Sequence, residues 1–163
     1  MTLIKTIPDN SRIWIYQANR EFTSDEKSKL EKNAGDFIVN WTSHSKLVNA
    51  DFEIRYNRFL VLLLDESHVA AGGCSIDSSV HFIQSLETEF KNPMTDRMKF
   101  AFRNGDRIEA VSKNEFEQLL SEGLITNDTI VFNNLVHTKR ELDSNWEIPF
   151  AKSWHKQFFI SKV

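Results

Sequence analysis

An unbroken apolar run from Phe59 to Leu64 constrains the fold more than any other part of this sequence. A strand formed by such a run has no polar face, so both of its faces must be covered. The residues before it, from Phe52 to Tyr56, alternate in polarity, and Asn57 stands between the two stretches. Asn57 either separates two strands or marks a bulge in one. We therefore predict an interior strand over 59–64.

Helices are predicted on both sides of this run. Thr23 and Glu26 have the spacing of a capping box, and an apolar stripe then indicates a helix over about 24–43. After the strand, Gly72–Ser79 is rich in glycine and serine and predicts a loop. A second helix is expected from Val80 to Phe90, because apolar residues recur there at helical spacing.

The second half of the chain predicts a hairpin, a helix and a strand. Asn104-Gly105 is a strong hairpin signal, since a type I′ turn needs positive φ at both of its central residues. Ser112 and Glu115 form a second capping box, and Gly123 is placed for a left-handed C-cap. A strand over 130–136 and a short terminal helix over 153–159 complete the predicted elements.

These elements predict an α+β fold, in which helices pack on a mixed, largely antiparallel sheet. Residues 12–16 add a first strand, because apolar residues occupy both of its faces. The order over 12–103 is then βαββαβ if Asn57 separates two strands, and this order permits a ferredoxin-like lobe. The hairpin, helix and strand that follow would form a C-terminal lobe.

Composition and charge restrict the class of protein. The 163 residues are 40% hydrophobic, with 13 Phe and 4 Trp, which is enough to bury a core. The single cysteine, Cys74, cannot form an internal disulfide. The sequence shows neither a signal peptide nor a run of ~20 apolar residues, so we expect a cytoplasmic protein without a membrane anchor. Lys and Arg number 20 against 23 Asp and Glu, so we expect no nucleic-acid partner.

The pair Asp65 and Glu66 follows the apolar run, as in the Walker B segment of an ATPase, where such residues orient magnesium and activate water. That chemistry also needs a GxxxxGK[ST] loop to hold the phosphates, and the sequence contains no Gly-Lys-Ser or Gly-Lys-Thr. A charged pair is also common where a buried strand emerges into water. We therefore expect no ATP hydrolysis, and we keep these two residues as members of another site.

The loop Gly72–Ser79 is the main candidate site. Glycines before a helix leave backbone N–H groups free, and these would bind an anion or the substrate of an enzyme. Cys74 would be the nucleophile and Asp77 a second catalytic residue, while the binding residues would be Gly72, Gly73, Ser75, Ser78, Ser79, Asp65, Glu66 and His44. If the site is real, we expect the glycines to adopt conformations closed to other residues and the N–H groups of 75–79 to point outward together.

The alternative for this loop is structural: Ser75, Asp77 or Ser78 caps the helix, and Cys74 packs as a small apolar residue. A metal site could combine His44, His68 and His81 with acidic residues and Cys74. The spacing of these residues along the chain is not typical of metal ligands. We expect neither a metal nor a cofactor.

Several segments together resemble a family of small uncharacterised bacterial proteins that often carry the label "ABC transporter ATPase". These segments are IWIYQANREFTSDE, NWTSHSKL, YNRFLVLLLDES, GGCSIDSSVHF and WEIPFAKSWHKQFF, and they cover most of the chain. The resemblance implies no established activity.

Residues 104–136, with the pattern S-x-x-E, LL, a glycine and then I-x-x-D-T-x-V-F, are similar to the hairpin-helix-strand unit of GYF-like interaction domains. The Gly-Tyr-Phe signature for proline-rich peptides is absent, so the ligand of that family does not carry over. The resemblance implies a boundary near Asn92-Pro93, between an α/β lobe over 1–93 and a GYF-like lobe over 94–163. A single continuous domain over 1–163 remains the alternative.

Two hypotheses for function follow. The first is a non-catalytic binding or adaptor protein with a protein or a small anionic ligand as its partner, because no catalytic motif is complete. The second is a small enzyme that uses the Gly72–Ser79 loop. An enzyme should have a pocket lined by the candidate residues of that loop, whereas an adaptor should expose an apolar patch.

Overall fold

The computed structural model describes residues 7–159, which divide into two compact units. The first unit comprises the chain up to Thr95 together with His137–Arg140, and the second comprises Asp96–Val136 and the chain from Glu141 on. Each unit has its own sheet and its own hydrophobic core. The α+β prediction is confirmed, since α-helices and antiparallel sheets make up both units.

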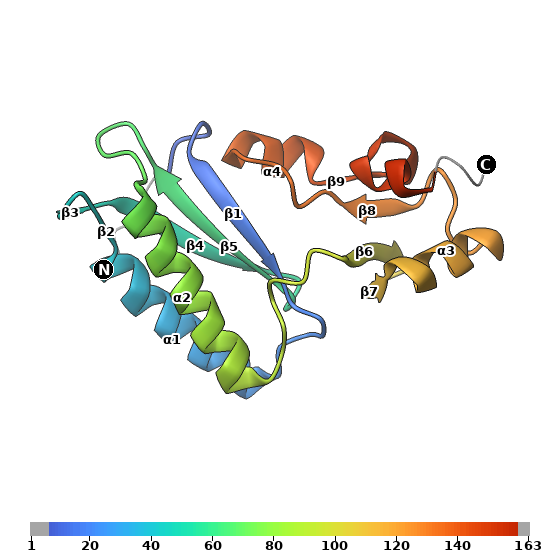
Figure 1. Ribbon diagram of the computed structural model, residues 1–163, viewed down its shortest axis with the longest axis horizontal. Coiled ribbons are helices and arrows are strands. Elements are labelled where there is room, and N and C mark those ends of the chain that lie inside the picture. Colours follow the sequence, from blue (N-terminus) through green and yellow to red (C-terminus); the bar gives the residue numbers. More distant parts are fainter. Residues whose placement is uncertain (1–6, 160–163) are drawn as a thin grey trace. The chain divides into compact units, whose positions relative to one another are not determined.

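The first unit contains a three-stranded antiparallel sheet in the order β1-β5-β4. The strands are β1 (Arg12–Gln17), β4 (Asn49–Arg55) and β5 (Phe59–Asp65), and the two helices are α1 (Ser24–Asn40) and α2 (Gly73–Phe90). Both helices lie on the same face of the sheet (Figure 1). A small hairpin of β2 (Thr42–Ser43) and β3 (Lys46–Leu47) follows α1.

The prediction of an interior strand is confirmed, because β5 lies between β1 and β4 and all of its residues are buried. Asn57 separates two strands and does not mark a bulge. Tyr56 and Asn57 both have positive φ, 54° and 53°, and the N–H of Arg58 donates to the carbonyl of Arg55. This geometry is that of a type I′ turn, which the tolerance of Asn for positive φ favours.

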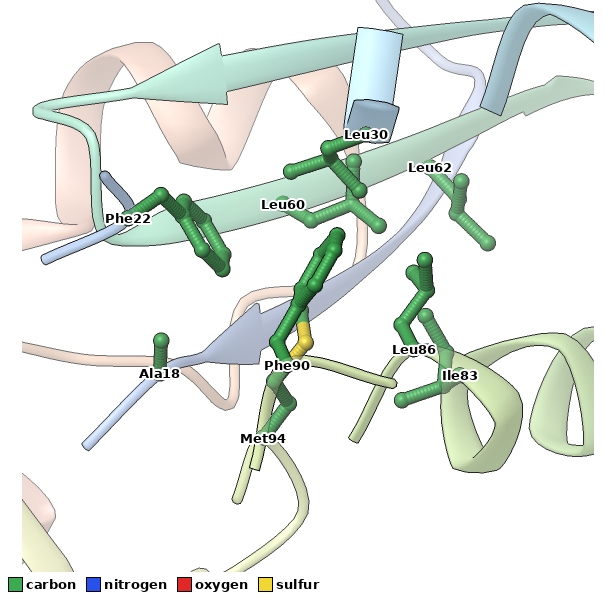
Figure 2. Packing of buried hydrophobic residues seen from close by; sticks show 9 residues of the cluster. All are labelled: Ala18, Phe22, Leu30, Leu60, Leu62, Ile83, Leu86, Phe90 and Met94. Atoms are coloured by element: carbon green, nitrogen blue, oxygen red, sulfur yellow. The ribbon is translucent and has the colours of Figure 1, made fainter. Parts of the chain in front are cut away.

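Side chains from β5 and both helices form the main core of this unit. Leu60 and Leu62 point from β5 toward Leu30 of α1 and toward α2 (Figure 2). The cluster as a whole contains Ala18, Phe22, Leu30, Leu60, Leu62, Ile83, Leu86, Phe90 and Met94. Burial of this cluster holds α1 and α2 against the sheet, because each apolar side chain removed from water contributes about 1.5–3 kcal/mol.

Apart from the small β2–β3 hairpin, the elements β1-α1-β4-β5-α2 have the split βαβ arrangement of a ferredoxin-like lobe, with β5 inserted between β1 and β4. The expected last strand of that order, β6, instead pairs within the second sheet. The other edge of β1 receives a later segment of the chain. The N–H of Ile13 donates to the carbonyl of His137 at 2.9 Å, and the N–H of Lys139 donates to the carbonyl of Ser11 at 3.0 Å.

The second unit contains a four-stranded sheet in the order β7-β6-β8-β9. Its elements are β6 (Lys99–Asn104), β7 (Arg107–Ser112), α3 (Lys113–Ser121), β8 (Ile130–Phe132), β9 (Glu147–Pro149), and the 3-10 helices η1 (Phe150–Lys152) and η2 (Trp154–Phe158). Between β8 and β9 the chain forms α4 (Lys139–Asn145). Aromatic rings dominate the core, in which Phe116 contacts Phe100, Phe102, Phe150 and Phe159.

The predicted elements of this unit are present with three differences. The strand expected over 130–136 ends at Phe132, and the terminal helix is a 3-10 helix. The hairpin turn is not type I′, because Asn104 pairs with Arg107 and only Gly105, at φ 62°, has positive φ in the turn. Glycine as the first central residue is typical of type II′. The left-handed C-cap at Gly123, with φ 75°, is confirmed.

Candidate functional site

The segment Gly72–Ser79 is not a loop, because α2 begins at Gly73. Gly72 is the N-cap with φ −101°, and the N–H of Ile76 already donates to the carbonyl of Gly72. The expected outward-pointing N–H groups of 75–79 are therefore absent, since those from Ile76 onward belong to the helix. Gly73, Cys74 and Ser75 are the residues whose N–H groups have no partner within the helix.

Tertiary contacts explain why a glycine- and serine-rich segment forms a helix here. Ser75 caps the helix, because its hydroxyl donates to the carbonyl of Gly72 and accepts from the N–H of Gly72. The carbonyl of Ser75 accepts from Nε1 of the buried Trp41 at 2.9 Å. These bonds and the burial of Ser75 and Ser79 outweigh the low helix propensity of Gly and Ser. The structural alternative of a serine cap is confirmed for Ser75.

The glycines of this segment avoid the left-handed region, contrary to the prediction. Among the described residues, positive φ in glycine occurs only at Gly105 and Gly123. Gly72 approaches the His44 side chain closely, since an added Cβ would lie 3.2 Å from Nε2 of His44. Gly73 has no such constraint, since an added Cβ would meet nothing within 4 Å. His44 and Gly72 are thus neighbours, as the candidate site requires.

The candidate catalytic residues lie on the surface. Cys74 and Asp77 are both exposed in the first two turns of α2, so Cys74 is not a packed core residue. The hydroxyls of Ser78 and Ser79 donate to the carbonyls of Cys74 and Ile76 in the same helix. The hydroxyl protons of these two serines are therefore committed within the helix.

Asp65 and Glu66 serve as local structural groups at the end of β5. The hydroxyl and backbone N–H of Ser67 both donate to Asp65, and these hydrogen bonds hold the pKa of its carboxyl below the usual value. Nδ2 of Asn49 donates to the other carboxyl oxygen. Glu66 accepts from the N–H of Ala71 at 2.9 Å and so closes the segment between β5 and α2. Within 7–159, no three His, Cys, Asp or Glu side chains are arranged to hold a metal ion.

A groove between α1 and α2, with a volume of about 450 Å³, is a second candidate site. Its floor consists of three aromatic side chains, of which Trp41 is buried while Phe37 and Phe82 are half-buried. The rings of Phe37 and Phe82 stack with centroids 4.5 Å apart, and the ring of Phe37 also contacts Trp41 at 5.1 Å. The stacked rings of Phe37 and Phe82 thus connect α1 and α2. We call this site the α1–α2 groove.

Polar side chains form the rim of the α1–α2 groove: Asn33, Asp36, Asn40, Thr42, Ser78 and Ser85. The hydroxyls of Ser78 and Ser85 donate to carbonyls of their own helix, and Nδ2 of Asn40 donates to the carbonyl of Asp36. The side chains of Asn33 and Asp36 make no hydrogen bond or ion pair with any residue that the structure describes. The rim thus offers unpaired amide and carboxylate groups above an aromatic floor.

Sequence reasoning identified one lining residue of this groove, Ser78, and missed the rest. Phe37 lies in the apolar stripe that predicted the helix over about 24–43, and the spacing of Asn33, Asp36 and Asn40 on one side of that helix is the signal that was available. No family model, no curated protein and no solved structure matches this chain. Its function is therefore inferred from the geometry of its own side chains.

Proposed function

We propose that this protein is a non-catalytic binding protein and that the α1–α2 groove is its binding site. The observation that supports this proposal is the combination of an aromatic floor with unpaired polar groups on an exposed rim. Sites that bind ligands are typically concave, with volumes of about 300–1,000 Å³. The groove volume of about 450 Å³ lies within that range.

The enzyme hypothesis is less well supported. Cys74, Asp77, Asp65, Glu66 and His44 do not line the groove, and a catalytic site needs its reacting groups to converge on one cavity. Asp65 and Glu66 have structural partners, and we expect no hydrolysis of ATP. The exposure of Cys74 at the start of α2 is the observation that keeps this alternative open. Rapid alkylation of Cys74 by iodoacetamide at pH 7 would favour the enzyme hypothesis, and slow alkylation would exclude Cys74 as its nucleophile.

The second unit is part of the proposal as a GYF-like interaction unit. Its chain order of hairpin, helix and strand, from β6 to β8, is the order that this resemblance implies. A cytoplasmic location is also proposed, because an exposed thiol at Cys74 without a second cysteine suits a reducing compartment. No helix in the described part of the chain is long and apolar enough to span a membrane.

A photo-crosslinker placed in the groove tests the binding site. Benzoylphenylalanine at Ser85 lies on the rim, and the same group at Gln84 lies one residue away, on an exposed position outside the groove. After irradiation in cells, we expect a discrete crosslinked partner from position 85 and little from position 84. No adduct from either position, or the same adducts from both, would contradict the proposed binding site.

A further inference from the structure

We propose that the α1–α2 groove binds an arginine side chain presented by an extended segment of a partner polypeptide. This inference rests on the proposed function and adds the chemistry of the ligand. Asp36 is the only charged residue among the side chains that line the groove. Its carboxylate is exposed and makes no ion pair with any described residue, so it remains free to pair with a cation from another molecule.

The charge around the groove also favours a cation. The stretches that contain the lining residues, 33–43 and 73–90, include the carboxylates of Asp36, Asp77, Glu87 and Glu89, against the two basic residues that flank them, Lys32 and Lys91. Lys29, one turn before Asn33 on α1, is already paired with Asp25 at 3.3 Å. A surface with one sign of charge raises the local concentration of ligands of the opposite sign.

The hydrogen-bonding capacity of the rim points in the same direction. Asn40 donates one of its two amide N–H groups to the carbonyl of Asp36, and its Oδ1 remains an acceptor. The hydroxyl protons of Ser78 and Ser85 are likewise committed to backbone carbonyls. The unpaired capacity therefore consists mainly of acceptors. A guanidinium group has five N–H donors and no acceptor, so it complements this rim better than a neutral or anionic group does.

The aromatic floor and the size of the groove favour an arginine side chain that belongs to a polypeptide. Half-buried Phe37 and Phe82 offer apolar contact for the three methylenes of an arginine stem, and planar guanidinium groups pack well on aromatic rings. A volume of about 450 Å³ holds one or two side chains but no folded domain. An extended segment of a partner, with one arginine inserted, fits these dimensions.

The test uses two blocked peptides that differ in one group: Ac-Ala-Arg-Ala-NH2 and its citrulline analogue, which has a similar shape and no charge. Titration into the full chain is followed by 15N-resolved amide shifts. We expect saturable shifts in residues 33–42 and 78–85 with the arginine peptide, and about fivefold weaker binding of the citrulline peptide. Asp36→Asn should weaken the binding of the arginine peptide by ~1.5- to 5-fold, which is the range for an exposed charge pair.

Glu31→Gln is the matched control, because Glu31 is an exposed carboxylate of α1 that does not line the groove. It should leave the affinity for the arginine peptide unchanged. Equal binding of both peptides, an equal effect of the two substitutions, or a preference for spermidine over the peptide would overturn the inference. If position 85 crosslinks to a partner but the arginine and citrulline peptides bind equally, the arginine assignment alone is overturned. If position 85 gives no crosslink and neither peptide shifts the amide signals, the proposed binding site is overturned as well.

Discussion

The hydrogen bond from Trp41 to the first turn of α2 gives the sharpest test of how this part of the fold is held. Nε1 of Trp41 donates to the carbonyl of Ser75 at 2.9 Å, and the ring is 2% exposed. Trp41→Phe removes the hydrogen bond and part of the ring. The hydrogen bond contributes about 1 kcal/mol and the lost ring volume about 1 kcal/mol more.

A loss of about 2 kcal/mol corresponds to ~30-fold in an opening equilibrium. We expect this loss to act on the start of α2, because the segment is rich in Gly and Ser and depends on tertiary contacts. Native-state hydrogen exchange measures it directly. In Trp41→Phe, the amides of residues 76–79 should exchange about 30-fold faster, and those of Ile83 and Leu86 should change much less.

Trp14→Phe serves as the control, because Trp14 contacts the ring of Trp41 at 5.8 Å but leaves the Trp41–Ser75 hydrogen bond in place. It should not accelerate exchange selectively at residues 76–79. The same profile from both variants, or uniform acceleration along α2 in Trp41→Phe, would refute the idea that Trp41 anchors the first turn.

Three further predictions concern the two cores and the N-cap. Burial lowers the pKa of His155 to about 4. We therefore expect the second unit to be fully stable above pH 6.5 and to lose stability as the pH falls from 6.5 through 4, and His155→Phe should reduce this pH dependence in thermal unfolding. Leu62→Ala should lower the free energy of unfolding of the first unit in urea by about 3–5 kcal/mol. Leu47→Ala, at a side chain that is 69% exposed, should lower it by less than about 0.5 kcal/mol, and similar losses from both variants would contradict the core assignment. Gly72→Ala should change the melting temperature little, because a φ of −101° is open to alanine and the exposed imidazole of His44, 3.2 Å from the new Cβ, can move away. A decrease of more than ~2 kcal/mol in the free energy of unfolding would show that His44 is fixed in place.

Local sequence signals predicted the elements whose determinants lie within a few residues. The apolar run of β5 specified an interior strand, since no other environment accommodates six consecutive apolar side chains in a strand. The capping box at Thr23 and Glu26 located the start of α1, because both reciprocal hydrogen bonds form within one turn. Gly123 ends α3 for a similarly local reason.

The sequence was misleading where distant residues decide the structure. Gly72–Ser79 has the composition of a loop, and its helical state depends on the caps and on Trp41, which is 34 residues away from Ser75. The α1–α2 groove was missed because Phe37 and Phe82 become neighbours only when both helices pack on the same face of the sheet. No pattern within either helix records that pairing.

The segment of residues 137–139 that covers the free edge of β1 affects how this chain can be divided experimentally. The sequence of the first unit is interrupted after Thr95 and is completed only by residues from the far side of a 41-residue stretch, Asp96–Val136. A fragment that stops at Thr95 would leave the N–H of Ile13 and the carbonyl of Ser11 exposed on an open strand edge, where chains of the same kind tend to pair and aggregate. The first unit is therefore better isolated by replacing residues 96–136 with a linker long enough to run the length of β1 than by truncation, so that the chain keeps its own edge strand covered.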